Sequence, residues 1–153
     1  MSIARVQTDH YRIALPVTLS DSTHGQMTHF ELITVRVHDA DGAQGAGYTY
    51  TVGCNGAAIH ATIARDLAPL LEGQRADLIE ALWQKMWWAS HYGGRGGAAA
   101  MSIAAVDIAL WDLKARKLSV PLWTLLGGHD ARVPCYAGGI DLHFALDKLL
   151  AQT

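Results

Sequence analysis

The stretch SIAAVDIALWDLKAR at residues 102–116, followed by VPLWTLLGG at residues 120–128, decides the fold of this chain. Its first part belongs to a run from Ala98 to Lys117 that is apolar nearly all round, apart from two aspartates and a basic last turn. A helix that is hydrophobic on every side must be buried between layers. We therefore expect a long, buried central helix over residues 98–117, followed by a short helix over residues 122–126.

Two amphipathic helices are predicted before this one. Apolar residues recur at i, i+4, i+8 and i+11 from Ile59, and Gly73 stands where that helix should stop. The next helix is expected to begin at Asp77, whose side chain can cap the free backbone N–H groups while Glu80 reaches back in a capping box. Residues 56–126 are therefore expected to be mainly helical.

The first fifty residues are expected to form strands. Ile33, Val35 and Val37 alternate with polar neighbours, which is the period-two signal of a half-buried strand. The sequence Asp-Ala-Asp-Gly at residues 39–42 supplies turn chemistry, and the β-formers of residues 45–52 complete a predicted hairpin. A further strand is expected before the hairpin, from Ile3 to Leu15, while residues 18–26 are polar and without period, so they predict a mobile loop.

The last part of the chain predicts the start of a new β–α unit. Residues 133–140 have the pattern of one buried strand, and a helix is expected over residues 144–150. Cys54 and Cys135 are isolated in the sequence, so both are expected to be buried free thiols.

Composition and charge exclude several classes of function. The chain is 50% hydrophobic and 17% charged, which is too apolar for a disordered protein. Its formal net charge is −2 and it has no dense Lys/Arg run, so nucleic acid is not an expected partner. No window approaches the ~18 apolar residues of a membrane span, and the first residues have no signal-peptide pattern. We expect a cytoplasmic protein with no membrane partner.

Candidate functional residues are few in the sequence. The chain's 8 histidines contain neither H-x-H nor H-E-x-x-H, so zinc binding is weakly supported. His24 differs, because it lies in the predicted loop, where a side chain that titrates near neutral pH can meet a substrate; an ordinary exposed histidine is the alternative. The segment Gly93–Gly97 lacks the Lys-Ser/Thr of a P-loop, and we expect Arg95 within it to pair with Asp107 rather than to bind an acid ligand.

The pattern A-A-x-D-x-A-L-W-D-L-x-A-R at residues 104–116, together with VPLWTLLGG, resembles the mandelate racemase subgroup of the enolase superfamily, and in particular its acid-sugar dehydratases of talarate/galactarate type. The resemblance implies an α+β fold, with a three-stranded antiparallel sheet and a helical bundle, as the N-terminal capping domain over residues 1–130. Residues 131–153 would then be the first βα unit of a TIM barrel. The remainder of the barrel is absent, because such a barrel takes ~250 residues.

The same resemblance implies a function for the complete enzyme. Such enzymes use magnesium, abstract a proton alpha to the carboxylate of a sugar acid and then eliminate water. The base and the magnesium ligands lie on later barrel strands, so no catalytic residue and no metal ligand is expected in this chain. The cap would supply loops that cover the substrate, and in these loops Asp21, His24 and Tyr50 are the expected substrate-binding residues.

Two alternatives to the dehydratase remain open. One is a racemase or epimerase of the same superfamily, and the other is a stand-alone, non-catalytic module that has lost its barrel. An isolated barrel strand also exposes edges that favour association. We therefore expect the chain to form homo-oligomers.

Overall fold

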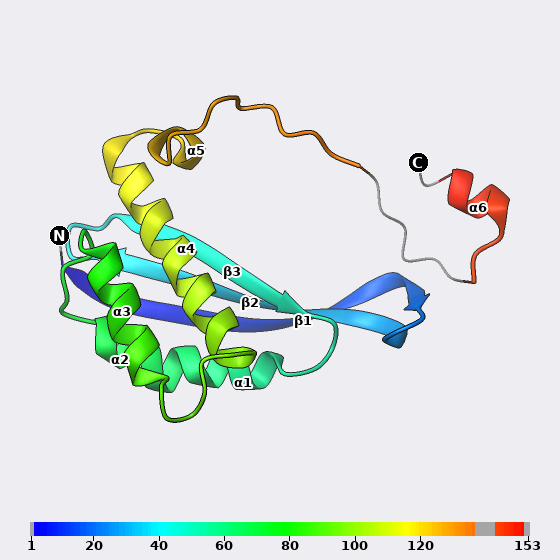
Figure 1. Cartoon of the computed structure of the whole chain (residues 1–153), viewed down its shortest axis with the longest axis horizontal. Coiled ribbons are helices and arrows are strands. Elements are labelled where there is room, and N and C mark those ends of the chain that lie inside the picture. Colours follow the sequence, from blue (N-terminus) through cyan, green and yellow to red (C-terminus); the bar gives the residue numbers. More distant parts are fainter. Residues whose placement is uncertain (1, 137–142, 152–153) are drawn as a thin grey trace.

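The computed structural model describes residues 2–136 and 143–151, and it confirms an α+β fold with a three-stranded antiparallel sheet. The helices between residues 56 and 118 lie together on one face of that sheet and leave the opposite face open, whereas the last helix lies away from the sheet (Figure 1). The elements are β1 (Ile3–Asp21), β2 (Gly25–Asp39), β3 (Gln44–Thr51), α1 (Gly56–Ala61), η1 (Thr62–Leu67), α2 (Ala68–Leu71), α3 (Ile79–Ala89), α4 (Ala98–Leu118), α5 (Leu122–Leu125) and α6 (Leu146–Leu150).

The predicted hairpin is confirmed as β2 and β3. Ile33, Val35 and Val37 are completely buried on the helix-covered face, while the residues between them point to the open face. The backbone N–H of Asp39 bonds to the carbonyl of Ala43 at 2.8 Å and closes the turn. The sheet order is β1-β2-β3, so β2 is the central strand.

The prediction of a mobile loop at residues 18–26 is wrong. β1 continues to Asp21 and β2 begins at Gly25, so the segment forms the tip of a long hairpin. The side-chain alternation did not predict this part of the strand, because the pairing register shifts between Ala14 and Leu19, around Pro16. A β-bulge changes the phase of the side-chain alternation, and proline removes a backbone donor. The period-two pattern is therefore interrupted, although the strand continues.

The long helix α4 lies directly on the sheet, and two glycines of β3 allow the contact. A Cβ atom on Gly45 would lie 2.1 Å from the carbonyl oxygen of Ala109, and one on Gly47 would lie 2.1 Å from that of Ala105. Glycine in a strand often marks such a close backbone approach. These glycines therefore bring α4 and β3 into backbone contact.

Burial of α4 on every side was predicted, and the structure contradicts it. Its buried residues face the sheet and the neighbouring helices, whereas Ala104 and Ile108 are exposed. Alanine has the highest intrinsic helix propensity, and an exposed alanine stabilises a helix without being buried. The apolar composition of α4 reflects helix propensity as well as burial.

The first helical segment runs from Gly56 to Leu71 as α1, η1 and α2, in agreement with its predicted stripe. Its middle part is π-helical, since the N–H of Ala68 bonds to the carbonyl of Ile63. Proline at position 69 has no backbone N–H and cannot donate an α-helical hydrogen bond. The π-helical turn lies directly before this proline. Gly73, at φ 79°, follows the end of the helix.

The predicted capping box at Asp77 is wrong. Helix α3 begins at Ile79, and its N-cap residue Leu78 makes no side-chain capping bond. The Asp77 carboxylate instead receives bonds from the guanidinium of Arg75, with Nε to Oδ1 at 3.1 Å. A bidentate guanidinium pair is a strong competitor for a carboxylate, so the cap is not formed.

The chain after α5 extends away from the rest of the fold (Figure 1). Residues 132–136 form no strand, and Val133 and Tyr136 are exposed, while the rest of the predicted strand, residues 137–140, lies outside the described residues. A parallel strand needs neighbouring strands for its backbone hydrogen bonds. Among the described residues, no strand lies beside residues 132–136. The helix predicted over residues 144–150 is present as the shorter α6.

Both cysteines contradict the predicted burial. Cys54 follows the end of β3 and Cys135 lies in the extended segment, and both are exposed free thiols. Neither position is on an element that packs into the core.

Candidate functional site

Asp21 and His24 lie together at the tip of the long hairpin. Nδ1 of the His24 imidazole is 2.7 Å from Oδ2 of Asp21. Oδ1 of Asp21 accepts the backbone N–H groups of Thr23, at 2.8 Å, and of His24. The backbone N–H of His24 and then its imidazole are the main causes that lower the pKa of Asp21 to about 2. Asp21 is therefore a carboxylate at neutral pH.

This geometry gives the two residues different chemical capacities. The Asp21 oxygens already receive three hydrogen bonds within the tip. His24 is turned with Nδ1 to the carboxylate, so Nε2 is the nitrogen available to an external ligand, and half of its side chain is exposed. A carboxylate at Nδ1 orients an imidazole and sets which nitrogen carries the proton. At this tip, His24 can offer a fixed polar group to a bound molecule.

Tyr50 lies apart from these two residues. It pairs with Leu32 in the sheet, whereas Asp21 pairs with Gly25 at the tip, about 24 Å further along the hairpin at ~3.4 Å per residue. The Tyr50 side chain is 58% exposed, and its ring makes an edge contact with Phe30 at 6.2 Å. The structure therefore brings Asp21 and His24 together but leaves Tyr50 on the open sheet face.

The sequence analysis missed a polar cluster centred on Glu31. This side chain lies on the helix-covered face of β2, in line with Ile33 and Val35, and is nearly buried. Its carboxylate accepts bonds from Thr51 Oγ1 at 2.6 Å and from the N–H of Gly56 at 2.9 Å. The Thr51 bond is the main cause that lowers the pKa of Glu31, against the opposing effect of burial. The signal was present: a charged residue at an inward position of an alternating strand requires partners.

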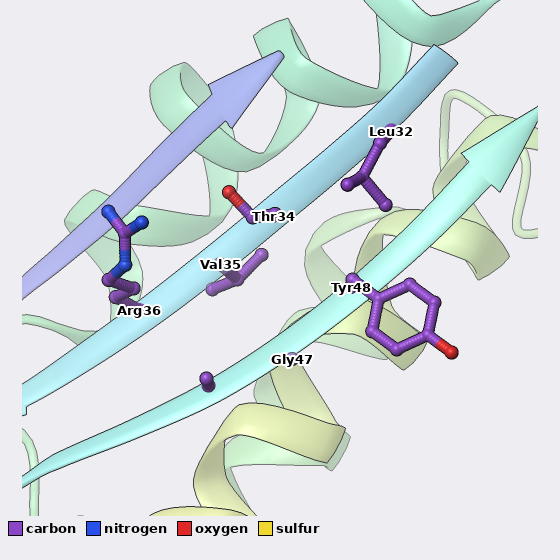
Figure 2. Close-up of a pocket in the computed structure, with 7 residues that line it drawn as sticks. Leu32, Thr34, Val35, Arg36, Gly47 and Tyr48 are labelled. Atoms are coloured by element: carbon purple, nitrogen blue, oxygen red, sulfur yellow. The ribbon is translucent and has the colours of Figure 1, made fainter. Parts of the chain in front are cut away.

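Figure 2 shows a groove on the open face of the sheet. It has a volume of about 410 Å³, and its lining residues include Leu32, Thr34 and Tyr48. Beside it, the guanidinium of Arg36 forms an ion pair with Asp9 at 3.1 Å. This groove lies well away from the hairpin tip, so it does not join the candidate residues there.

Arg95 does not form the predicted pair with Asp107. Its Nε donates to the carbonyl of Trp87 at 3.2 Å, and its guanidinium carbon lies 4.8 Å from the ring centre of Trp87 and 4.5 Å from that of Trp88. Stacking on two indoles is a favourable place for a guanidinium. Burial, and secondarily the charge of Glu80, raise the pKa of Asp107.

The described residues do not form a metal site. Within residues 2–136 and 143–151, no three His, Cys, Asp or Glu side chains gather as metal ligands. Nor does any helix in the described part of the chain have the length and apolar character of a membrane span.

Comparison with known proteins identifies the family. Residues 2–127 match the family described as "Mandelate racemase / muconate lactonizing enzyme, N-terminal domain". The chain belongs to this family. The resemblance to the enolase superfamily is thereby confirmed, as is the fold of an N-terminal cap with a three-stranded sheet and helices.

Two solved members of the family show the same fold. A racemase from Streptomyces coelicolor A3(2) with bound magnesium has a TM-score of 0.95 and 57% identity, over 98% of this chain and 42% of that one. An L-talarate/galactarate dehydratase from Salmonella typhimurium LT2, liganded with magnesium and L-lyxarohydroxamate, has a TM-score of 0.90 and 33% identity, over 99% of this chain and 40% of that one.

Curated members of the family carry out more than one reaction. A 3,6-anhydro-alpha-L-galactonate cycloisomerase from Streptomyces coelicolor is 57% identical over 98% of this chain and 42% of its own length. The L-talarate/galactarate dehydratase of Salmonella typhimurium is 36% identical over 90% of this chain and 35% of its own length. The chain thus spans about two fifths of the length of these relatives, which include both dehydratases and a cycloisomerase.

Proposed function

We propose that this chain is the substrate-covering part of an acid-sugar enzyme that removes the proton alpha to a carboxylate and then releases the β-oxygen. The observation that carries this proposal is the 57% identity, over 98% of the chain, to a 3,6-anhydro-alpha-L-galactonate cycloisomerase. It favours ring-opening isomerisation as the reaction. Dehydration of an open-chain sugar acid is the second candidate, supported by the 36% identical talarate/galactarate dehydratase and by the 38% identical arabinonate dehydratase.

The two reactions share their bond changes. A base removes the proton at C2, the electron pair of that bond forms the C2–C3 double bond, and the C3–O bond breaks. In a 3,6-anhydro ring the departing oxygen stays attached at C6 and takes up a proton, so the product is an isomer. In an open-chain acid the C3 hydroxyl departs as water. In both cases the resulting C2 enol becomes a ketone. The two reactions can therefore use the same catalytic groups and differ only in which substrate the active site binds.

We further propose the division of labour within the complete enzyme. Residues 1–130 form the cap, and residues 131–153 begin the barrel, which would hold the base and the magnesium ligands. Magnesium use is supported by the magnesium-bound relatives, and no residue of this chain is assigned to the metal. The cap would bind the distal end of the substrate and exclude water from the reacting carbon.

His24 and Tyr50 are the proposed substrate contacts, and Asp21 orients His24. A site that hydrogen-bonds hydroxyl groups discriminates strongly against analogues that lack them. The polar tip therefore suits the hydroxyl-rich end of a sugar acid.

The test uses the complete enzyme, by which we mean this chain together with the barrel that the proposal assigns to the same protein. Purified enzyme is incubated with 3,6-anhydrogalactonate, galactarate and L-talarate, and the products are followed by NMR in deuterated water. We expect an isomeric 2-keto acid from the anhydro acid. Preferential loss of water from the open-chain acids would favour the dehydratase. Deuterium incorporation at C2 without elimination would instead indicate a racemase or epimerase.

A second assay addresses the stand-alone alternative. The 153-residue chain by itself is expected to convert none of these acids. Turnover by the chain alone would contradict the assignment of the chemistry to a barrel.

A further inference from the structure

A single carboxylate bonds to both ends of the segment Val52–Asn55, which joins β3 to α1. Oε2 of Glu31 accepts a hydrogen bond from Thr51 Oγ1 at 2.6 Å, just before the segment. The same oxygen accepts the backbone N–H of Gly56 at 2.9 Å, just after the segment. The other oxygen, Oε1, lies 3.1 Å from Nε2 of His10 on β1. One oxygen atom therefore closes four residues into a loop.

Apolar packing contributes little to the position of this loop. Val52, Cys54 and Asn55 are exposed, and Asn55 is left-handed at φ 71° without a side-chain capping bond to α1. Gly53, at φ 88°, lies against the His29 imidazole, and a Cβ atom there would be 3.0 Å from Nε2. The conformation of the loop therefore depends largely on the polar contacts at its ends.

The space around Gly56 is shaped to the carboxylate. A Cβ atom on Gly56 would lie 2.7 Å from Cδ of Glu31 and 2.6 Å from Nε2 of His10, so a larger residue there would displace one of these two side chains. His10 is itself stacked on His60 of α1, with ring centres 6.2 Å apart, and His60 Nε2 lies 3.3 Å from the carbonyl of Thr8. The Glu31 carboxylate is thus supported from β1 and from α1.

We propose that Glu31 is a positioning residue, whose carboxylate fixes the loop Val52–Asn55 where it covers the substrate. It would not touch the substrate, because its oxygens are occupied by Thr51, Gly56 and His10. The catalytic consequence rests on the proposed function, in which Tyr50, two residues before this loop, contacts the substrate. The contact that holds the loop does not depend on that function and can be tested separately.

The first test measures amide hydrogen exchange by NMR in the 153-residue chain. In Glu31→Leu, an apolar side chain of similar size replaces the carboxylate, so no acceptor remains for the backbone N–H of Gly56. We expect exchange at Gly56 to become more than tenfold faster. Glu72→Leu is the matched control, because Glu72 Oε1 also accepts a backbone N–H, that of Val6 at 3.1 Å, away from the loop. That variant should leave exchange at Gly56 unchanged.

Thr51→Val and Thr51→Ser provide a second pair, in case Glu31→Leu does not fold. Valine keeps the β-branched shape and removes the hydroxyl, whereas serine keeps the donor. We expect faster exchange at Gly56 in Thr51→Val and protection close to wild type in Thr51→Ser. Wild-type exchange at Gly56 in folded Glu31→Leu, or in folded Thr51→Val, overturns the inference.

The second test measures kinetics in the complete enzyme. Glu31→Leu is expected to lower kcat/KM more than tenfold, mainly through a higher KM, because the carboxylate is remote from the reacting atoms. Faster exchange at Gly56 together with wild-type kinetics would show that the loop is held as described but does not cover the substrate. In that case the positioning role is overturned. The proposed reaction, ring opening or dehydration, is unaffected, because the product assay tests it separately.

Discussion

His24 and Asp21 show how far a local hydrogen-bond pattern can define a chemical role. The tip residues bond mainly to each other, so their arrangement is set within residues 21–24. That Asp21 binds substrate stays a prediction, and within the chain its carboxylate also orients His24. The sequence indicated that the residues of this segment are polar. It could not show that Nε2 of His24 stays available to a ligand, because that depends on the conformation of the backbone turn.

The Asp21 carboxyl should titrate well below its ordinary range. Its pKa is lowered from 3.8 to about 2, so the bonds at the hairpin tip are fully present above pH 3.8 and are lost as the pH falls towards 2. Carbon-detected NMR of the Asp21 carboxyl in the chain should give a midpoint near 2. In His24→Gln the imidazole contribution is removed, so the midpoint should rise while the backbone donors keep it below 3.8. A wild-type midpoint at 3.8 would contradict the described contacts.

His24→Ala and Tyr50→Phe should each reduce kcat/KM of the complete enzyme more than tenfold, which corresponds to about 1.4 kcal/mol or more. The two side chains lie far apart in the cap, so their effects should add in the double variant. Steady-state kinetics with the best substrate checks both expectations. Wild-type kinetics in both single variants would remove these residues from the substrate site.

At the scale of elements, regular patterns predicted most of the fold and irregular ones did not. The alternation at Ile33, Val35 and Val37 predicted β2 correctly, because nothing interrupts its phase. The hairpin tip was missed because the register shift near Pro16 breaks the alternation. Arg95 was assigned the wrong partner because proximity in the sequence carries no information about the tryptophans that the fold places beside it.

Two strand glycines make a prediction for the contact between α4 and β3. Gly47→Ala places a Cβ atom 2.1 Å from the Ala105 carbonyl oxygen, so α4 must move away from the sheet. We expect a loss of about 1–3 kcal/mol or more in the free energy of unfolding, measured in urea. Gly93→Ala is the control, because nothing lies within 4 Å of its added Cβ, and it should stay within about 0.5 kcal/mol of wild type. Equal stability of the two variants would contradict the backbone contact.

The whole molecule has one covered and one open sheet face. Tyr11, Ile13, Tyr48 and Tyr50 project from the open face, and each is more than two fifths exposed. Large exposed apolar patches mark interaction surfaces in soluble proteins. β1 and β3 are moreover edge strands, with backbone groups free to pair with another chain.

The 153-residue chain is therefore expected to self-associate in solution. Light scattering across a concentration series should show species larger than a monomer, in line with a homo-oligomer. The double variant Tyr11→Thr/Tyr48→Thr removes two aromatic rings and keeps residues that favour strands, so it should shift the distribution towards monomer. A monodisperse wild-type monomer would contradict this expectation and favour the stand-alone module.

The self-contained hydrogen bonding of the hairpin tip has an evolutionary consequence. Its polar side chains contact one another rather than the core, so residues there can be replaced with little effect on folding. Relatives with different reactions superpose on this chain with TM-scores of 0.95 and 0.90. If the tip contacts substrate as proposed, selection can alter what it recognises while the underlying architecture is inherited unchanged.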